Sequence, residues 1–176
     1  IDHCLVGSEM CIRDSLSGII YPIVMGWQWG GGWLASIGFS DFAGSTLVHS
    51  TGGAAALAGA IIIGPRLGRF TKSGSPAPIK PFAASSIPLV TLGVFVLWLG
   101  WFGFNGGSQL AMGTADDAIA VSTIFINTFL AGAGGVIGAA IITRLHFGKT
   151  DVVQMLNGCI GGLVAVTAEP LSLIHI

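Results

Sequence analysis

The sequence contains few charged residues. Only 9% of its 176 residues are Asp, Glu, Lys or Arg, whereas a soluble domain typically carries about 25%. Hydrophobic residues make up 52% of the chain, and the mean hydropathy is +0.83. This shortage of charge excludes an ordinary soluble domain and predicts a protein that lies in a lipid bilayer.

Basic side chains are too few to bind nucleic acid. Seven Lys and Arg residues stand against eight Asp and Glu, for a net charge of -1, and a nucleic-acid site needs a basic patch to neutralise phosphates. The three cysteines have neither metal-ligand spacing nor an obvious pairing. No paired carboxylates and no nucleophile with its base occur at membrane depth. We therefore expect no nucleic-acid partner, no enzyme activity, no metal and no cofactor.

Both ends of the sequence differ in character from the rest. Residues 1–15 hold two of the three cysteines and four of the fifteen charged residues, and they lack the ordered regions of a signal peptide. Residues 171–176 also look unrelated to what precedes them. Both stretches resemble translated sequencing-adaptor sequence. We expect 1–15 and 171–176 to be non-native, and 16–170 to be an internal fragment of a longer protein.

Five apolar stretches in this region are candidates to cross a hydrocarbon core of ~30 Å as helices. The second carries no formal charge over 22 residues and ends where Pro65 cannot continue a helix. In the fourth, Gly134 and Gly138 form a candidate helix contact face. The pattern predicts an all-α membrane protein, a polytopic helical bundle. The expected spans are 16–39, 42–63, 86–104, 118–143 and 151–169.

The distribution of Lys and Arg predicts an orientation. Outside residues 1–15, all six lie in the loops 64–85 and 144–150, while the loops after the first and third spans have none. The positive-inside rule therefore places loops 64–85 and 144–150 in the cytoplasm. Trp29, Asp41 and Ser108 then lie toward the outer face, with His49 deeper in the membrane.

Three residues in the first two spans are candidates for function. His49 is the one ionisable side chain of the second span, and such a group at membrane depth usually faces a bundle interior or a pathway; the alternative is a packing histidine. Asp41 precedes the same span, where a helix N-cap belongs. Trp29 is either an interface anchor or an aromatic face that attracts a cation. The amides of Asn105 and Asn127 are expected in interhelical hydrogen bonds.

Four motifs, in order and at specific spacing, resemble the ammonium transporter family (Amt/Mep/Rh), most closely its bacterial and plant Amt branch. The resemblance implies an eleven-helix fold with an inverted repeat, of which this chain would cover about the fourth to the eighth helix. It also implies a homotrimer for the full-length protein. The motifs are Trp29-Gly-Gly-Gly, Asp41-Phe-Ala-Gly-Ser-Thr-Leu-Val-His49, Gly64-Pro-Arg-Leu-Gly-Arg-Phe70 and Gly100-Trp-Phe-Gly-Phe-Asn-Gly-Gly-Ser108.

The resemblance also assigns roles to single residues. Trp29 and Ser108 match the outer ammonium site, Phe104 matches a gate, and His49 matches the first pore histidine. Asp41 matches the acidic residue that supports the outer site without touching the ion. The family's second pore histidine and second gate phenylalanine have no counterpart in this chain.

These roles suit the chemistry of ammonium and imply its transport across a membrane. An aromatic face attracts the cation, a hydroxyl accepts one of its N–H groups, and a neutral histidine offers ammonia one donor and one acceptor. The expected partners are ammonium or ammonia, the lipid bilayer and a PII-type regulatory protein at the cytoplasmic face. The expected location is a bacterial inner membrane. The alternatives are an ammonium sensor or a non-conducting truncated homologue.

Overall fold

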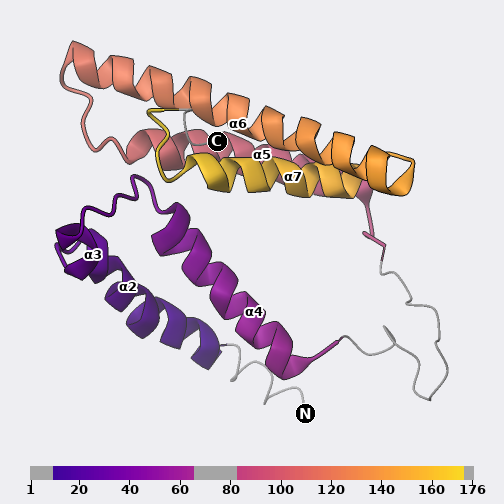
Figure 1. The fold of residues 1–176 in the computed structure, drawn as a ribbon, viewed down its shortest axis with the longest axis horizontal. Coiled ribbons are helices and arrows are strands. Elements are labelled where there is room, and N and C mark those ends of the chain that lie inside the picture. Colours follow the sequence, from indigo (N-terminus) through magenta and orange to yellow (C-terminus); the bar gives the residue numbers. More distant parts are fainter. Residues whose placement is uncertain (1–9, 66–82, 173–176) are drawn as a thin grey trace.

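The computed structural model describes residues 10–65 and 83–172, and every regular element in these ranges is a helix (Figure 1). The helical residues 10–15 continue into the first of these elements. Two short elements, η1 and η2, are π-helices. The elements are η1 (Leu16–Ile20), α2 (Tyr21–Gln28), α3 (Trp33–Ser36), η2 (Ser45–Ser50), α4 (Thr51–Ile63), α5 (Ile87–Gly107), α6 (Ala115–Phe147) and α7 (Val152–Val166).

Residues 16–39 form η1 and α2, which are continuous, and the separate short helix α3. The chain reverses at residues 29–32, where the Gly32 amide donates to the carbonyl of Gly26 over 3.2 Å. A Cβ atom on Gly30 or Gly32 would lie 2.8 or 2.7 Å from that carbonyl oxygen. The glycine run therefore permits a close reversal of the backbone that breaks the span.

The helix boundaries follow from local capping. Ser86 accepts a hydrogen bond from the Leu89 amide at the start of α5. Thr114 and Asp117 form a reciprocal capping box at the start of α6, which satisfies two amide donors of its first turn. The 33-residue α6 is about 50 Å long at 1.5 Å per residue, which exceeds the thickness of a hydrocarbon core.

Helices α5, α6 and α7 form one packed group, and α6 and α7 approach most closely through glycines (Figure 1). A Cβ atom on Gly135 would lie 2.1 Å from the carbonyl oxygen of Gly158, and one on Gly162 would lie 2.2 Å from that of Ala131. Small residues allow such backbone contact in membrane proteins. Gly134 and Gly138 do not form the predicted contact face among the described residues, because a Cβ atom on either would meet nothing there within 4 Å.

Two buried asparagines tie this group together. Asn105 of α5 donates from Nδ2 to Oγ1 of Thr128 in α6 over 3.0 Å. Asn127 of α6 donates from Nδ2 to the carbonyl of Pro170 over 2.8 Å. The first bond confirms the expected interhelical role of Asn105, whereas Asn127 bonds to the turn that follows α7, which ends at Val166.

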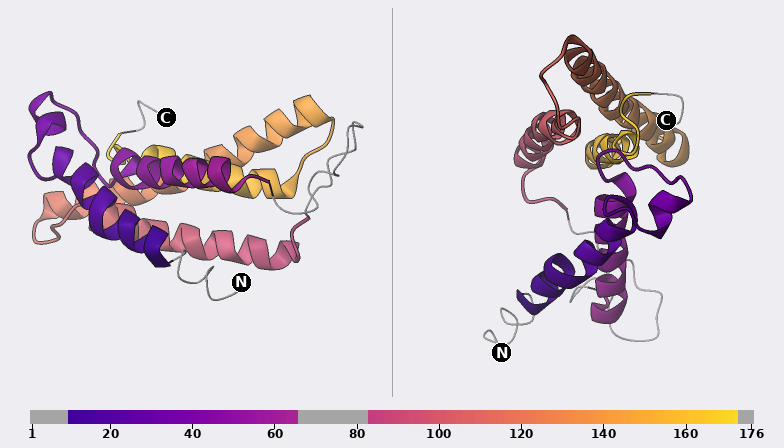
Figure 2. Two further views of the ribbon diagram at one scale, coloured as in Figure 1. Left: turned by 90° about the horizontal axis from the view of Figure 1, so that it is seen from below. Right: turned by 90° about the vertical axis from the view of Figure 1, so that its left-hand side faces the viewer.

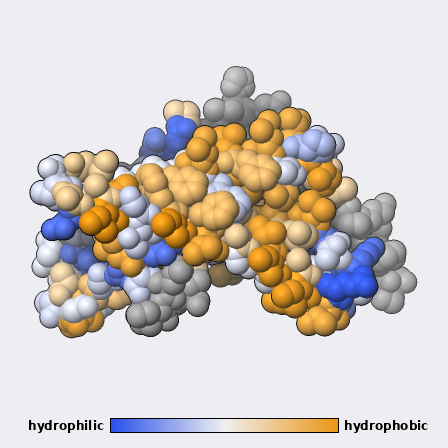
Figure 3. All heavy atoms as spheres, turned by 90° about the horizontal axis from the view of Figure 1, so that it is seen from above, coloured by the Kyte–Doolittle hydropathy of each residue, from blue (hydrophilic) through white to orange (hydrophobic). Residues whose placement is uncertain are grey.

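Three helical segments in the described residues are long and apolar enough to cross a membrane, namely Ser45–Ile63, Ile87–Gly107 and Ala115–Phe147. Their outward faces are apolar: Leu99 of α5 is 72% exposed and Ile62 of α4 is 84% exposed. Figure 3 shows apolar side chains across most of one face of the molecule. These features are those of an integral membrane protein.

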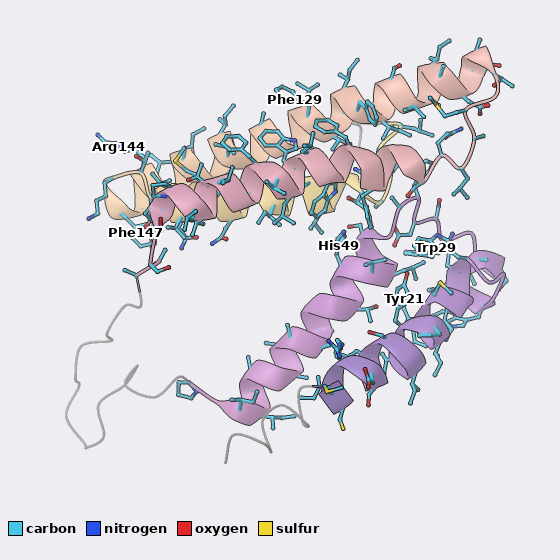
Figure 4. The ribbon with its side chains drawn as sticks, turned by 180° about the vertical axis from the view of Figure 1, so that it is seen from behind. Tyr21, Trp29, His49, Phe129, Arg144 and Phe147 are labelled. Atoms are coloured by element: carbon cyan, nitrogen blue, oxygen red, sulfur yellow. The ribbon has the colours of Figure 1, made fainter. Side chains whose placement is uncertain are left out.

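The connections alternate between the two ends of the molecule. The loop at residues 29–44 and the loop at 108–114 lie at one end, and the loop at 148–151 lies at the other (Figures 1 and 2). Arg144 and Trp29 accordingly lie at opposite ends (Figure 4). Residues 66–82, which carry most of the first basic loop, are outside the described residues.

Candidate functional site

The carboxylate of Asp41 organises the loop before the second span. Asp41 is 1% exposed, and its two oxygens accept hydrogen bonds of 2.8–3.0 Å from four successive backbone amides, those of residues 44–47. The first turn of a helix leaves such amides without partners. The side chain therefore caps η2, although Asp41 lies three residues before Gly44, the N-cap residue. Gly44 has a φ of 106°, which glycine adopts without strain.

The same loop is attached to the end of α7. The amide of Phe42 donates to the carbonyl of Ala168 over 2.8 Å, and the amide of Ala43 donates to that of Thr167 over 3.0 Å. These residues are far apart in the sequence. The start of the second span is therefore held on the α5–α7 group by backbone hydrogen bonds.

His49 lies in the π-helical turn that follows. Its amide donates to the carbonyl of Gly44, five residues back, over 3.1 Å. Such wide turns occur often at functional sites. The turn lies where the second span meets the α5–α7 group, and His49 is found at this junction (Figure 4).

The imidazole of His49 is in contact with two aromatic rings of α5. It stacks on Trp101, with ring centroids 5.0 Å apart and an interplanar angle of 19°. Its centroid is 5.5 Å from that of Phe104, at an angle of 44°. Its Nε2 atom is buried and has no hydrogen-bond partner among the described residues. The ring thus presents one polar atom inside an aromatic cluster, which we define as His49, Trp101 and Phe104.

Trp29 and Ser108 lie outside this aromatic cluster. The indole Nε1 of Trp29 donates to the backbone carbonyl of Asp41 over 2.8 Å, and the side chain remains 41% exposed. The hydroxyl of Ser108 donates to the carbonyl of Phe104 over 2.8 Å. No hydrogen bond or ring contact joins Trp29 to Ser108 in the part of the chain described, although their loops lie at one end of the molecule (Figure 1).

The structure thus brings the five residues that the sequence singled out into two groups. His49 is in contact with Phe104, and the hydroxyl of Ser108 donates to the backbone carbonyl of Phe104. Trp29 is hydrogen-bonded to Asp41. Within residues 10–65 and 83–172, no three His, Cys, Asp or Glu side chains are grouped so that they could hold a metal ion.

Two residues of the site were missed. Trp101 lies three residues before Phe104, so both project from one face of a helix, and this spacing could have indicated that they act together. Thr167 accepts a hydrogen bond from Nε1 of Trp101 over 2.8 Å. Because 66 residues separate this pair, no local pattern could have revealed it.

Comparison with known proteins identifies the family. The model of a family described as the Ammonium Transporter Family matches residues 8–173. This chain belongs to that family. Among curated relatives, ammonium transporter Amt2 of Archaeoglobus fulgidus is 44% identical over 163 residues, which cover 87% of this chain and 33% of the relative.

Solved structures of the family have the same arrangement. Mep2 of Candida albicans matches with a TM-score of 0.70 and 32% identity, over 87% of this chain and 32% of that one. Mep2 of Saccharomyces cerevisiae matches with a TM-score of 0.69 and 34% identity, over 85% of this chain and 32% of that one. The chain is thus a polytopic helical protein of the ammonium transporter fold, and it spans about a third of the length of these relatives.

Proposed function

We propose that this chain carries part of a path by which ammonium, or the ammonia derived from it, crosses a membrane. The aromatic cluster is the observation that supports this proposal most strongly. An imidazole nitrogen that is buried against two aromatic rings, and has no partner among the described residues, is a polar atom with which a solute could form a hydrogen bond in an otherwise apolar environment. A small solute with both donor and acceptor capacity could use it, because a neutral imidazole offers one of each.

Recruitment of the cation belongs to Trp29 and Ser108. The Nε1–H of Trp29 is occupied by the Asp41 carbonyl, which holds the ring in place and leaves its exposed face free to attract a cation, at about 0.5–2 kcal/mol. The hydroxyl hydrogen of Ser108 is likewise occupied by the Phe104 carbonyl. Its oxygen lone pairs are thereby directed toward an incoming N–H donor.

Passage beyond Phe104 favours the neutral species. A charge at the centre of a bilayer costs about 3 kcal/mol on translocon scales and far more in simulations. Loss of a proton to water outside Phe104 removes this cost. Ammonia can then exchange hydrogen bonds with Nε2 of His49 inside the aromatic cluster.

The setting of this path follows from the family and from the charges. We propose that loops 64–85 and 144–150 face the cytoplasm, in a bacterial inner membrane, because they carry the basic residues. The full-length protein would form a homotrimer and meet a PII-type regulatory protein at that face. Its role is transport and not catalysis. The exposed apolar faces of α4 and α5 are compatible with contact with lipid or further helices.

Because the chain spans about a third of its relatives, the test is ammonium flux into liposomes that contain a full-length family member in which this chain replaces the matching segment. His49→Ala removes the polar atom from the aromatic cluster, and we expect the flux to fall at least about tenfold, the change that corresponds to one net hydrogen bond. His146→Ala is the matched control, because His146 is exposed near the end of α6 and lies outside the aromatic cluster. An unchanged flux in His49→Ala would show that the conduction role is wrong.

The same measurement separates the alternatives. A non-conducting truncated homologue gives no flux above that of empty liposomes. A sensor also gives no flux, but its tryptophan fluorescence changes with ammonium concentration because Trp29 still binds the cation.

A further inference from the structure

Thr167 connects the aromatic cluster to the loop organised by Asp41. Thr167 is 0% exposed at the end of α7. Its Oγ1 accepts the Trp101 indole hydrogen bond of 2.8 Å and donates to the carbonyl of Leu163 over 2.7 Å. A hydroxyl has one hydrogen to donate, so this side chain is fixed in one orientation, with its lone pair directed at Trp101.

The indole of Trp101 has a single donor, and this bond determines how the ring is turned. The side chain is 8% exposed, and its ring lies 5.0 Å from that of His49 and 6.0 Å from that of Phe104. If the indole rotated about its side-chain bonds, it would withdraw the flat surface on which the imidazole stacks. The bond to Thr167 therefore fixes the orientation of the Trp101 ring within the aromatic cluster.

Thr167 also holds the segment that leads to His49, the other ring of the stack. The backbone carbonyl of Thr167 accepts the amide of Ala43, which belongs to the loop organised by Asp41 before the turn that bears His49. The side chain of Thr167 thus holds Trp101, and its backbone holds the segment that leads to His49. One residue sets the position of each ring relative to the other.

We propose that Thr167 is a positioning residue of the conduction path, acting on His49 through Trp101 and not by contact with the transported species. This inference rests on the proposed function. The indole N–H of Trp101 would be left buried and without a partner if the hydroxyl were removed, a state that buried donors avoid strongly. The indole would then turn to find another acceptor, and the stack would loosen.

Thr167→Val tests the proposal, because valine keeps the branched shape and loses only the hydroxyl. Thr167→Ser keeps the hydroxyl and serves as the conservative variant. Thr167→Ala also lacks the hydroxyl and has a smaller side chain than valine, so it repeats the test if the valine variant does not assemble. Thr143→Val is the matched control. Thr143 is also buried, at 5% exposure, but among the described residues its hydroxyl bonds to carbonyls of its own helix, those of Ala139 and Ala140.

Two readouts are taken in liposomes, a spectrum of the chain and the flux through the full-length protein that contains it. Ultraviolet resonance Raman spectroscopy reports whether an indole N–H is hydrogen-bonded, and Trp101→Phe assigns the band of this residue among the five tryptophans. Ammonium flux reports conduction. We expect Thr167→Val to shift the Trp101 band to that of a free N–H and to lower flux about tenfold, as the loss of one net hydrogen bond would. Thr167→Ser and Thr143→Val should resemble the wild type in both readouts.

Three results would overturn the positioning role: an unchanged Trp101 band in Thr167→Val, a shifted band with flux retained, or equal losses in Thr143→Val. A failure of the proposed function is distinguishable, since the full-length protein that contains the wild-type chain would then conduct no ammonium, whatever happened to the Raman band.

Discussion

The two halves of the segment Ser45–Ile63 are held very differently. In the first half, η2, the Asp41 carboxylate accepts the opening amides, and His49 packs on α5. In the second half, α4, no residue is buried, and the helix diverges from the α5–α7 group as it leaves His49 (Figure 1). A single apolar helical segment thus has one fixed end and one end without buried contacts among the described residues.

This difference shows what fixes a helix in this protein. Apolar side chains occur along both halves, so apolar character alone does not set position. Between helices in lipid the hydrophobic effect contributes little, and close packing and polar contacts replace it. The fixed half is where hydrogen bonds to a buried carboxylate and to the end of α7 are made. The candidate site lies in the half that those polar contacts hold.

The largest effect should come from removing the carboxylate. Asp41→Ala leaves the amides of residues 44–47 without their acceptor, and we expect the free energy of unfolding to fall by roughly 4 kcal/mol, since charge-assisted hydrogen bonds contribute about 2 kcal/mol each and water replaces some. The measurement is SDS-driven unfolding in mild detergent, followed by circular dichroism.

Asp151→Ala is the control for this change. Asp151 also caps a helix, but it is exposed and accepts hydrogen bonds from only two amides of α7, so its loss should cost about 1 kcal/mol. Equal losses in the two variants would mean that the fixed half of the segment does not depend on Asp41.

A smaller effect on stability should distinguish alanine substitutions at two glycines of α6, Gly135 and Gly138. Gly135→Ala introduces a Cβ atom against the backbone of Gly158, and such overpacking costs about 1–3 kcal/mol. Gly138→Ala meets open space and should stabilise α6 by up to about 1 kcal/mol through helix propensity. The SDS-driven unfolding assay measures both effects. Destabilisation by both substitutions would show that the α6–α7 contact is placed wrongly.

Much of the fold was predictable from local signals. A run without charge indicated the helix that ends at Ile63, and Pro65 marked its end. The contact between α6 and α7 was predicted at the wrong residues, because a glycine-rich helix presents glycine on several faces and the sequence does not say which face meets a neighbour. The break at residues 29–32 had a local signal, since three consecutive glycines between tryptophans favour the end of a helix.

The site was predictable only in part, for a different reason. Asp41 precedes an apolar run, and a carboxylate there commonly caps a helix. The pairing of Trp101 with Thr167, and the attachment of Ala43 to the end of α7, depend on residues far apart in the sequence. Neither propensity nor periodicity carries information about such contacts.

The smallest effect should come from the indole of Trp29. Trp29→Phe keeps an aromatic face but loses the hydrogen bond to the Asp41 carbonyl, so we expect a loss of about 1 kcal/mol of stability, typical of one hydrogen bond. Trp33→Phe is the control, since Trp33 is 57% exposed. If Trp33→Phe destabilised the chain as much as Trp29→Phe, the hydrogen bond to Asp41 would have no special role in holding the loop.

The most direct test of the account is whether the two rings of the stack touch in a membrane. Solid-state NMR of the isotope-labelled chain in lipid bilayers can detect through-space correlations between ring carbons. His146 and Phe147, with ring centroids 4.7 Å apart, provide an internal reference. The account predicts a correlation between His49 and Trp101, whose centroids are 5.0 Å apart, as clear as that of the reference pair. A missing His49–Trp101 correlation beside an intact reference would contradict it.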